Sequence, residues 1–226
     1  MSQTSAHRVL FLGHSFIWRL ESFIKRASFP CVERDFALPP STSFRFHGVG
    51  GRTVATLRRS DLGVVASFKP TIIILEIGSN DLCDYTVSID ALATNIAQLI
   101  HTLHVRFHVA HIILGQILPR IRSPPTCPEY NKRVERLNGA LLALLKRAPY
   151  ATLWFHPKVT THSVILFSND GVYLNMAGNH LLHHSYREAL HKCWRRLARM
   201  ATNRRHLLSH GATWPSRQRA VRPHRY

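Results

Sequence analysis

Acidic residues are scarce in this chain, and their scarcity is the most unusual feature of its composition. Twelve Asp and Glu residues stand against 30 Lys and Arg residues, which gives a formal net charge of +18 at pH 7. The imbalance is greatest at the carboxyl end, because no acidic residue follows Glu188. Such a basic segment either attracts a polyanion, such as RNA, DNA or an anionic membrane, or is simply a solvated end. Both interpretations remain open.

Cysteine is also sparse, with four residues that lie far apart and never form a Cys-x-x-Cys pair. This spacing argues against a disulfide framework and against a zinc site. The 16 histidines are scattered, and we expect neither a metal nor a cofactor. Hydrophobic runs are too short for a membrane span, and the first residues lack the features of a signal peptide. The composition therefore predicts a cytoplasmic or nuclear protein.

Apolar segments of strand length alternate with amphipathic segments of helix length. Strands are predicted at 8–13, 43–47, 71–77, 111–117 and 151–155, and helices at 16–28, 54–68, 88–107, 130–146 and 177 to about 201. Five strand–helix repeats predict a three-layer α/β/α, doubly wound, flavodoxin-like fold with five parallel strands. We expect this domain to span residues 7–192. Residues 193–226 would form a basic extension, helical at first and disordered after Gly211.

Short polar and glycine-rich motifs follow the predicted strands. Gly13-His14-Ser15 ends the first strand, Gly50-Gly51 follows the second, and Gly78-Ser79-Asn80-Asp81 follows the third. A fourth motif, Asp170-Gly171-Val172-Tyr173, precedes the last helix. Loops beyond the carboxyl ends of parallel strands converge at one edge of the sheet, where doubly wound proteins place their chemistry. The motifs therefore indicate a site at that edge.

Each motif also has an ordinary structural explanation. A serine after a strand is more often a helix N-cap than a nucleophile. Asn80 can cap a turn, and Asp170 can form an Asx turn or cap a helix. Gly50-Gly51 can be a flexible loop. Four such coincidences in order are much less common than any one of them.

Together and in this order, the motifs resemble those of the SGNH hydrolases, also called GDSL-type esterases, over about residues 8–191. The segments LGHSF, FHGVGGRT, LEIGSNDL and DGVYLN, with a later SYR, resemble still more the esterase-like domains of animal retrotransposon-related proteins. This resemblance implies the SGNH hydrolase fold. It also implies hydrolysis of a small acyl or acetyl ester without a metal or cofactor.

The resemblance implies a role for each matching residue. Ser15 would be the nucleophile, and Asp170 matches the acid that orients the family's histidine. The backbone N–H groups of Ser15 and Gly51 and the side-chain amide of Asn80 would form the oxyanion hole. Converging donors of this kind suit acyl transfer, since the loss of one typically costs about 10²–10³ in turnover.

Tyr173 occupies the position where the family pattern has its histidine. A serine nucleophile needs a base that titrates near neutral pH. A tyrosine with a pKa of about 10 would be ionised in only about one molecule in 10³ at pH 7. Loss of the base from such a triad can cost up to about 10⁶ in turnover. Tyr173 therefore predicts a weakened or inactive esterase.

Three explanations of Tyr173 are compatible with the sequence. The site could be a disabled one on an intact scaffold, another histidine could replace the base, or Tyr173 or water could support residual chemistry. The replacement candidates, none at the family spacing, are His156, His162, His180, His183 and His184. His14 is not assigned this role, because a residue adjacent to Ser15 normally projects elsewhere from the same turn.

Two functions follow. The first is a serine ester hydrolase for small acyl esters that acts through Ser15. The alternative is a non-catalytic SGNH scaffold that binds nucleic acid through its Arg-rich carboxyl-terminal tail. The tail arginines that carry this alternative are Arg195, Arg196, Arg199, Arg204 and Arg205.

Overall fold

A single parallel sheet organises the protein. The computed structural model describes residues 7–26 and 32–210, with the backbone alone for residues 201 and 203–210. Its strands are β1 (Arg8–Gly13), β2 (Ser43–Gly48), β3 (Ile72–Glu76), β4 (His111–Gly115) and β5 (Ala151–Trp154). The strand order is β2-β1-β3-β4-β5, and every pairing is parallel. This order is the flavodoxin-like one, so the predicted architecture is confirmed.

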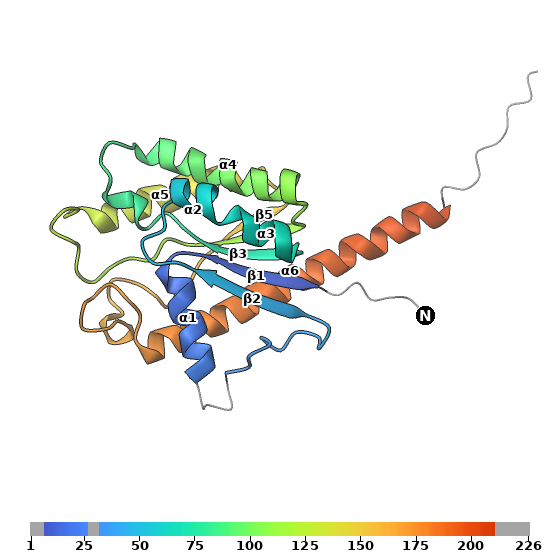
Figure 1. Ribbon diagram of the computed structural model, residues 1–226, viewed down its shortest axis with the longest axis horizontal. Helices are drawn as coiled ribbons and strands as arrows, with labels where there is room; N and C mark the ends of the chain where they lie inside the picture. Colours follow the sequence, from blue (N-terminus) through green and yellow to red (C-terminus); the bar gives the residue numbers. More distant parts are fainter. Residues whose placement is uncertain (1–6, 27–31, 211–226) are drawn as a thin grey trace, which may run out of the picture. The chain divides into compact units, whose positions relative to one another are not determined.

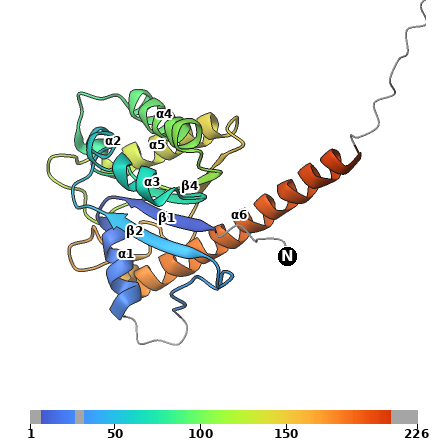
Figure 2. The same cartoon turned by 45° about the vertical axis from the view of Figure 1, so that its right-hand side comes forward.

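Helices cover both faces of the sheet (Figure 1). The helices are α1 (Ser15–Arg26), α2 (Val54–Ser60), α3 (Leu62–Phe68), α4 (Ile89–Phe107), α5 (Tyr130–Leu145) and α6 (Met176–His210), with 3-10 turns η1 (Asp81–Cys83) and η2 (Val164–Leu166). Helices α2 to α5 lie on one face, and α1 lies on the other (Figures 1 and 2). Both faces of the central strands are therefore shielded from water.

The prediction of one continuous helix over 54–68 is wrong, because this segment forms two helices, α2 and α3. Asp61 ends α2 and precedes α3, with φ −111° and ψ −9°. Its side chain is buried and ion-paired with Arg52 rather than facing solvent as it would on a continuous surface helix. The interruption thus places one carboxylate beneath the loop that follows β2.

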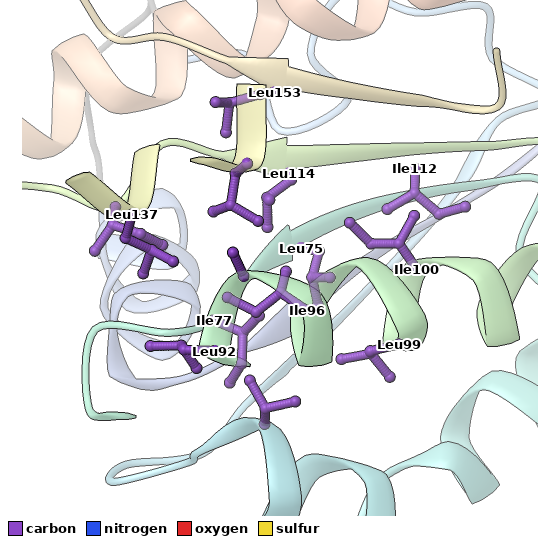
Figure 3. Close-up of a cluster of buried hydrophobic side chains, with 14 of the residues drawn as sticks. Leu75, Ile77, Leu92, Ile96, Leu99, Ile100, Ile112, Leu114, Leu137 and Leu153 are labelled. Atoms are coloured by element: carbon purple, nitrogen blue, oxygen red, sulfur yellow. The ribbon is translucent and has the colours of Figure 1, made fainter. Parts of the chain in front are cut away.

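The main core lies between the sheet and helices α4 and α5 (Figure 3). Alternate strand residues point to the same face, so Leu75, Ile112 and Leu114 project together towards α4. Helix α4 packs against them with a stripe of buried apolar residues at helical spacing, which includes Ile96 and Leu99. All five residues of β3 are buried, as its largely apolar run predicted for a central strand.

The chain separates into two compact units, Met1–Leu190 and His191–Tyr226. Helix α6 begins in the first unit, and its residues from His191 onward belong to the second. The disorder predicted after Gly211 falls outside the described residues. Within the described ranges, no helix combines the length and the apolar character needed to cross a bilayer.

The core predicts a large effect at Leu99, which is fully buried. Replacement of Leu99 by Ala should lower the free energy of unfolding by about 2–5 kcal/mol, because it removes buried methyl groups and leaves a cavity. Leu142→Ala on α5 is the control, since that side chain is 44% exposed. Denaturant unfolding followed by circular dichroism measures both. Equal losses in the two variants would contradict this assignment of the core.

Candidate active site

Ser15 stands at the junction of β1 and α1, as the first residue of the helix. The turn before it is held tightly. The N–H of His14 donates to the carbonyl oxygen of Glu76 at 3.0 Å, and the N–H of Val49 donates to that of Gly13 at 3.0 Å. A Cβ at Gly13 would overlap the Glu76 carbonyl, so only glycine permits this approach. Ser15 is therefore fixed at the edge between β1 and β3, where the strand order reverses and ligands bind in this fold.

The Ser15 side chain is half-buried, and within the described residues its hydroxyl has no hydrogen-bond partner. An N–H group at the first turn of a helix also has no intrahelical partner and can donate to an anion. The residue thus combines an unengaged hydroxyl with an available backbone donor. What it lacks is a base bonded to that hydroxyl.

His14 connects the serine turn to the loop after β3. Its Nδ1 accepts from the N–H of Phe16 at 3.3 Å, and its Nε2 lies 3.0 Å from Oγ of Ser79. Because Nδ1 accepts a hydrogen bond, the proton of the neutral ring is on Nε2, which donates to the hydroxyl of Ser79. Burial, with a smaller contribution from Arg120, lowers the pKa of His14 to about 3. The ring is therefore neutral at pH 7, and both nitrogens are engaged away from Ser15.

The structure brings Asn80 and the Gly51 loop together. Nδ2 of Asn80 donates to the carbonyl oxygen of Arg52 at 2.9 Å. An amide nitrogen carries two N–H groups, so this bond orients the side chain and leaves a second donor. Gly51 is exposed and has φ +71°, a conformation that favours glycine. The Asn80 amide and the Gly51 backbone thus lie on adjoining loops beside the β1–β3 edge.

The loop after β2 is clamped at two points that the sequence analysis did not identify. The buried carboxylate of Asp61 is ion-paired with Arg52: Nη2 donates to Oδ1 at 2.9 Å, and Nε lies 2.8 Å from Oδ2. His47 Nε2 lies 3.0 Å from the same Oδ1. The N–H of Val54 donates to Oδ1 of Asp81 at 3.0 Å. These contacts fix the carbonyl of Arg52, which in turn orients the side chain of Asn80.

Asp170 shapes the loop that precedes α6. Its Oδ1 accepts the N–H groups of Val172 at 2.8 Å and Tyr173 at 3.0 Å, which is the geometry of an Asx turn. The carbonyl of Tyr173 accepts from both the N–H and the hydroxyl of Ser168. Asp170 therefore holds the backbone of Tyr173. None of its hydrogen bonds in the described part of the chain goes to an imidazole.

The ring of Tyr173 lies against α1, the helix that begins with Ser15. The centroid of the Tyr173 ring is 5.8 Å from the centroid of the Phe16 ring. Cζ of Arg19 lies over the face of the Tyr173 ring, 3.5 Å from its centroid. A guanidinium over an aromatic face is an attractive arrangement. Tyr173 thus packs against the first two turns of the helix that begins at Ser15.

Two of the candidate replacement histidines are buried in other networks. His156 bonds through Nδ1 to Oγ of Ser185 at 2.8 Å, and burial lowers its pKa to about 3. Nε2 of His183 lies 3.0 Å from the carbonyl oxygen of Glu33.

The other three histidines are less buried. His184 pairs with Glu188 across one turn of α6, His162 is exposed, and His180 is half-buried at the start of that helix. No hydrogen bond among the described residues joins His156, His183 or His184 to Ser15.

A buried acid at the end of β3 lies behind the serine turn. The hydroxyl of Tyr186 on α6 donates to Oε1 of Glu76, and both side chains are buried. Burial raises the pKa of Glu76 to about 7, although the bond from Tyr186 opposes this shift. Gly115 leaves the space for this pair, since a Cβ there would meet the Tyr186 hydroxyl. A single acid within an apolar strand was the sequence signal for this contact.

In the ranges 7–26 and 32–210, no three His, Cys, Asp or Glu side chains are grouped so that they could hold a metal ion. The polar groups of the site are hydroxyl, amide and backbone donors. Such groups stabilise a developing oxyanion.

Comparison with known proteins identifies relatives by sequence model and by structure. The GDSL-like lipase/acylhydrolase family model matches residues 29–181. No curated protein matches the chain. Similar solved structures share the fold of this chain at low sequence identity. Each similarity extends over most of both chains.

Three of these structures illustrate the likeness. A GDSL-like lipase from Bacteroides thetaiotaomicron is 20% identical, with a TM-score of 0.62 over 85% of this chain and 93% of its own. A variant of an acetyl-xylooligosaccharide esterase from Geobacillus is 19% identical, with a TM-score of 0.59 over 82% and 94%. A lipase/acylhydrolase from Enterococcus faecalis is 17% identical, with a TM-score of 0.60 over 81% and 95%.

His14 gives the site a measurable pH dependence. Its pKa in the folded protein, about 3, is below the ordinary value of 6.5, so only the unfolded chain takes up this proton between those pH values. The stability contributed by the neutral ring is present above pH 6.5 and is lost as the pH falls toward 3. Replacement of His14 by Gln should flatten the rise of unfolding free energy with pH in this window by up to about 1.4 kcal/mol per pH unit.

Urea unfolding at several pH values between 4 and 7 measures this slope. His162→Gln is the matched control, because that side chain is exposed and has no part in the serine turn. A slope that is the same in His14→Gln and in the unmodified protein would contradict a neutral, doubly engaged imidazole.

Proposed function

The chain belongs to the GDSL-like lipase/acylhydrolase family, and from this we propose that the β1–β3 edge is an SGNH-type ester hydrolysis site that Tyr173 leaves weakened or inactive. The observation that supports the proposal is the pair of hydrogen bonds that link the three loops: His14, beside Ser15, bonds to Ser79, and the amide of Asn80 bonds to the carbonyl of Arg52, beside Gly51. A nucleophile and at least two kinds of donor thus share one edge of the sheet. The substrate class is a small acyl or acetyl ester.

The proposed reaction is acyl transfer in two steps. The Ser15 oxygen attacks the ester carbonyl, and the alcohol leaves with a proton to give an acyl-serine. Water then cleaves the acyl-serine, which releases the carboxylic acid and restores the hydroxyl. In both steps the carbonyl oxygen becomes negatively charged, and the N–H groups of Ser15 and Gly51 and the amide of Asn80 would stabilise it.

The missing component is the base. The Ser15 hydroxyl has no hydrogen-bond partner in the described part of the chain, and the ring of Tyr173 is stacked beneath Arg19. A neutral phenol has no basic nitrogen like that of an imidazole, so it is a poor general base for a serine hydroxyl. Proton removal is then left to water. This supports an intact scaffold with low turnover over rescue by His156 or His183, whose rings are engaged elsewhere.

Replacement of Tyr173 by His should restore hydrolysis. We expect the rate on p-nitrophenyl acetate to rise by about 10²-fold, at the lower end of the usual 10²–10⁴ for a general base, because Asp170 is engaged with the backbone. Tyr173→Phe is the matched control, since it keeps the ring and should not gain activity. Initial rates at pH 7.5 measure the three proteins.

The same experiment in a Ser15→Ala background separates acyl transfer from nonspecific catalysis, because the gain should vanish there. High activity of the unmodified protein that depends on Ser15 would contradict a disabled site and indicate another base. If Tyr173→His has no effect and a serine-directed phosphonate fails to label Ser15 in that variant, ester hydrolysis is ruled out.

A second function is favoured by the carboxyl-terminal part of α6, and it concerns nucleic acid. Lys192, Arg195, Arg196 and Arg199 are exposed and follow the i, i+3, i+4, i+7 spacing of one helix face. The backbone of Arg204 and Arg205 continues the same helix. No acidic residue occurs in this segment. The likeness of the sequence to retrotransposon-related domains supports the same reading.

Binding to a duplex of about 20 base pairs should weaken steeply with salt. If the helix neutralises about four phosphates, the logarithm of the binding constant should fall with a slope of about −4 against the logarithm of salt concentration. Arg195→Gln, Arg196→Gln and Arg199→Gln together should reduce the magnitude of the slope by about 3. Fluorescence anisotropy measures this, with Lys158→Gln as the control. Binding that ignores salt or the triple replacement would contradict a role for this helix face.

A further inference from the structure

A surface cavity of about 270 Å³ lies between α1 and the segment that leads into α6. Figure 2 shows α1 beside the first turns of α6, within the first compact unit. Side chains of α1 that include Trp18, Arg19 and Arg26 form one wall, and Met176 and Asn179 contribute to the other. Neither Ser15 nor Gly51 nor Asn80 is part of the lining. The cavity therefore does not include the proposed nucleophile or oxyanion donors, although it lies next to Tyr173.

The cavity is positively charged. Arg19 and Arg26 are seven residues apart on α1, which places them two turns apart on the same helix face. No lining residue is acidic, and across residues 7–26 and 32–210 no carboxylate forms an ion pair with either arginine. The acid nearest in sequence, Glu21, is paired with Lys25 at 2.7 Å. The positive charge is thus uncompensated within the described protein.

The rim of the cavity is apolar and unusually exposed. Trp18 is 51% exposed and Met176 is 64% exposed, although both are large hydrophobic side chains. Apolar side chains that gather beside a cavity and face water are typical of a binding surface. Contact with an apolar ligand would remove part of this surface from water.

Two buried polar atoms of the lining residues have no partner. Asn179 is only 7% exposed, and its Nδ2 donates to the carbonyls of Leu174 and Asn175, but its Oδ1 accepts nothing in the described structure. The Nε of Arg19 is likewise unpaired there. An unpaired buried donor or acceptor costs about 1–3 kcal/mol. Both atoms are covered in this structure.

We propose that this cavity binds a small amphipathic organic anion, whose carboxylate or phosphate lies between Arg19 and Arg26 and whose apolar body covers Trp18 and Met176. The charge fits the two arginines, and the apolar body fits the exposed rim. Arg19 also stacks on Tyr173, so a ligand bound in this cavity would lie next to the residue that occupies the family's histidine position. This inference does not depend on ester hydrolysis at Ser15.

Calorimetric titration of the full-length chain with octanoate and octyl phosphate tests the proposal, with octanamide as the uncharged comparison. For ligands of about ten non-hydrogen atoms we expect dissociation constants on the order of 0.1–1 mM. Octanamide should bind at least tenfold more weakly. A stronger response to octanoate than to octyl phosphate, or the reverse, identifies which anion the cavity prefers, and either supports an anion site.

Replacement of Arg19 or Arg26 by Gln should weaken octanoate binding about tenfold each. Lys25→Gln is the matched control on α1, because Lys25 lies outside the cavity and is paired with Glu21. Ser22→Glu, which puts a negative charge into the lining, should abolish binding without removing an existing contact. Circular dichroism confirms that each variant is folded.

Ser15→Ala should bind octanoate unchanged, whether or not the unmodified protein hydrolyses esters. Loss of binding in Ser15→Ala would place the anion at the catalytic edge and overturn the proposal. Equal binding of octanamide, unchanged binding in both arginine variants, or no binding at 10 mM would overturn it as well.

Discussion

The close approach of β1 to the carboxyl end of β3 is the constraint on which the site depends. Gly13 has no Cβ to separate the strands, so the Glu76 carbonyl can accept the N–H of His14. This contact sets Ser15 and Asn80 at one edge, and the buried ring of His14 then ties the two loops together. The side chain of Glu76 makes a second contact: its carboxyl group accepts a hydrogen bond from the hydroxyl of Tyr186 on α6. Glu76 therefore contacts both the turn that precedes Ser15 and helix α6.

The site also separates two requirements of acyl transfer that are usually met together. The groups that would stabilise negative charge are held by backbone geometry and by a buried ion pair at Asp61, which do not involve residue 173. The proton acceptor would come from a different loop, shaped by Asp170. Because the two parts have separate supports, a tyrosine at position 173 does not disturb the loops of Gly51 and Asn80. The ring instead gains the contacts with Phe16 and Arg19.

Features that depend on local sequence were predictable, whereas contacts between distant segments were not. The alternation of apolar and amphipathic segments predicted the five-stranded parallel sheet, and the largely apolar run 72–76 predicted its central strand. The break at Asp61 was missed, because it arises from an ion pair with the preceding loop rather than from a helix-breaking residue. The Arg19–Tyr173 stack joins positions more than 150 residues apart and leaves no periodic signal. The roles assigned to Ser15, Gly51, Asn80 and Asp170 remain predictions.

The clamp between Arg52 and Asp61 has a consequence for how the sequence can diverge. Removal of one partner from a buried ion pair costs about 3–5 kcal/mol, whereas replacement of both by apolar residues is often neutral. Asp61 is also the residue at which two helices meet, so it has little freedom to move. Epistasis between the two positions is therefore expected. In a lineage released from catalysis, the pair would be lost together, and its retention would be a record of past or present selection on the loop it supports.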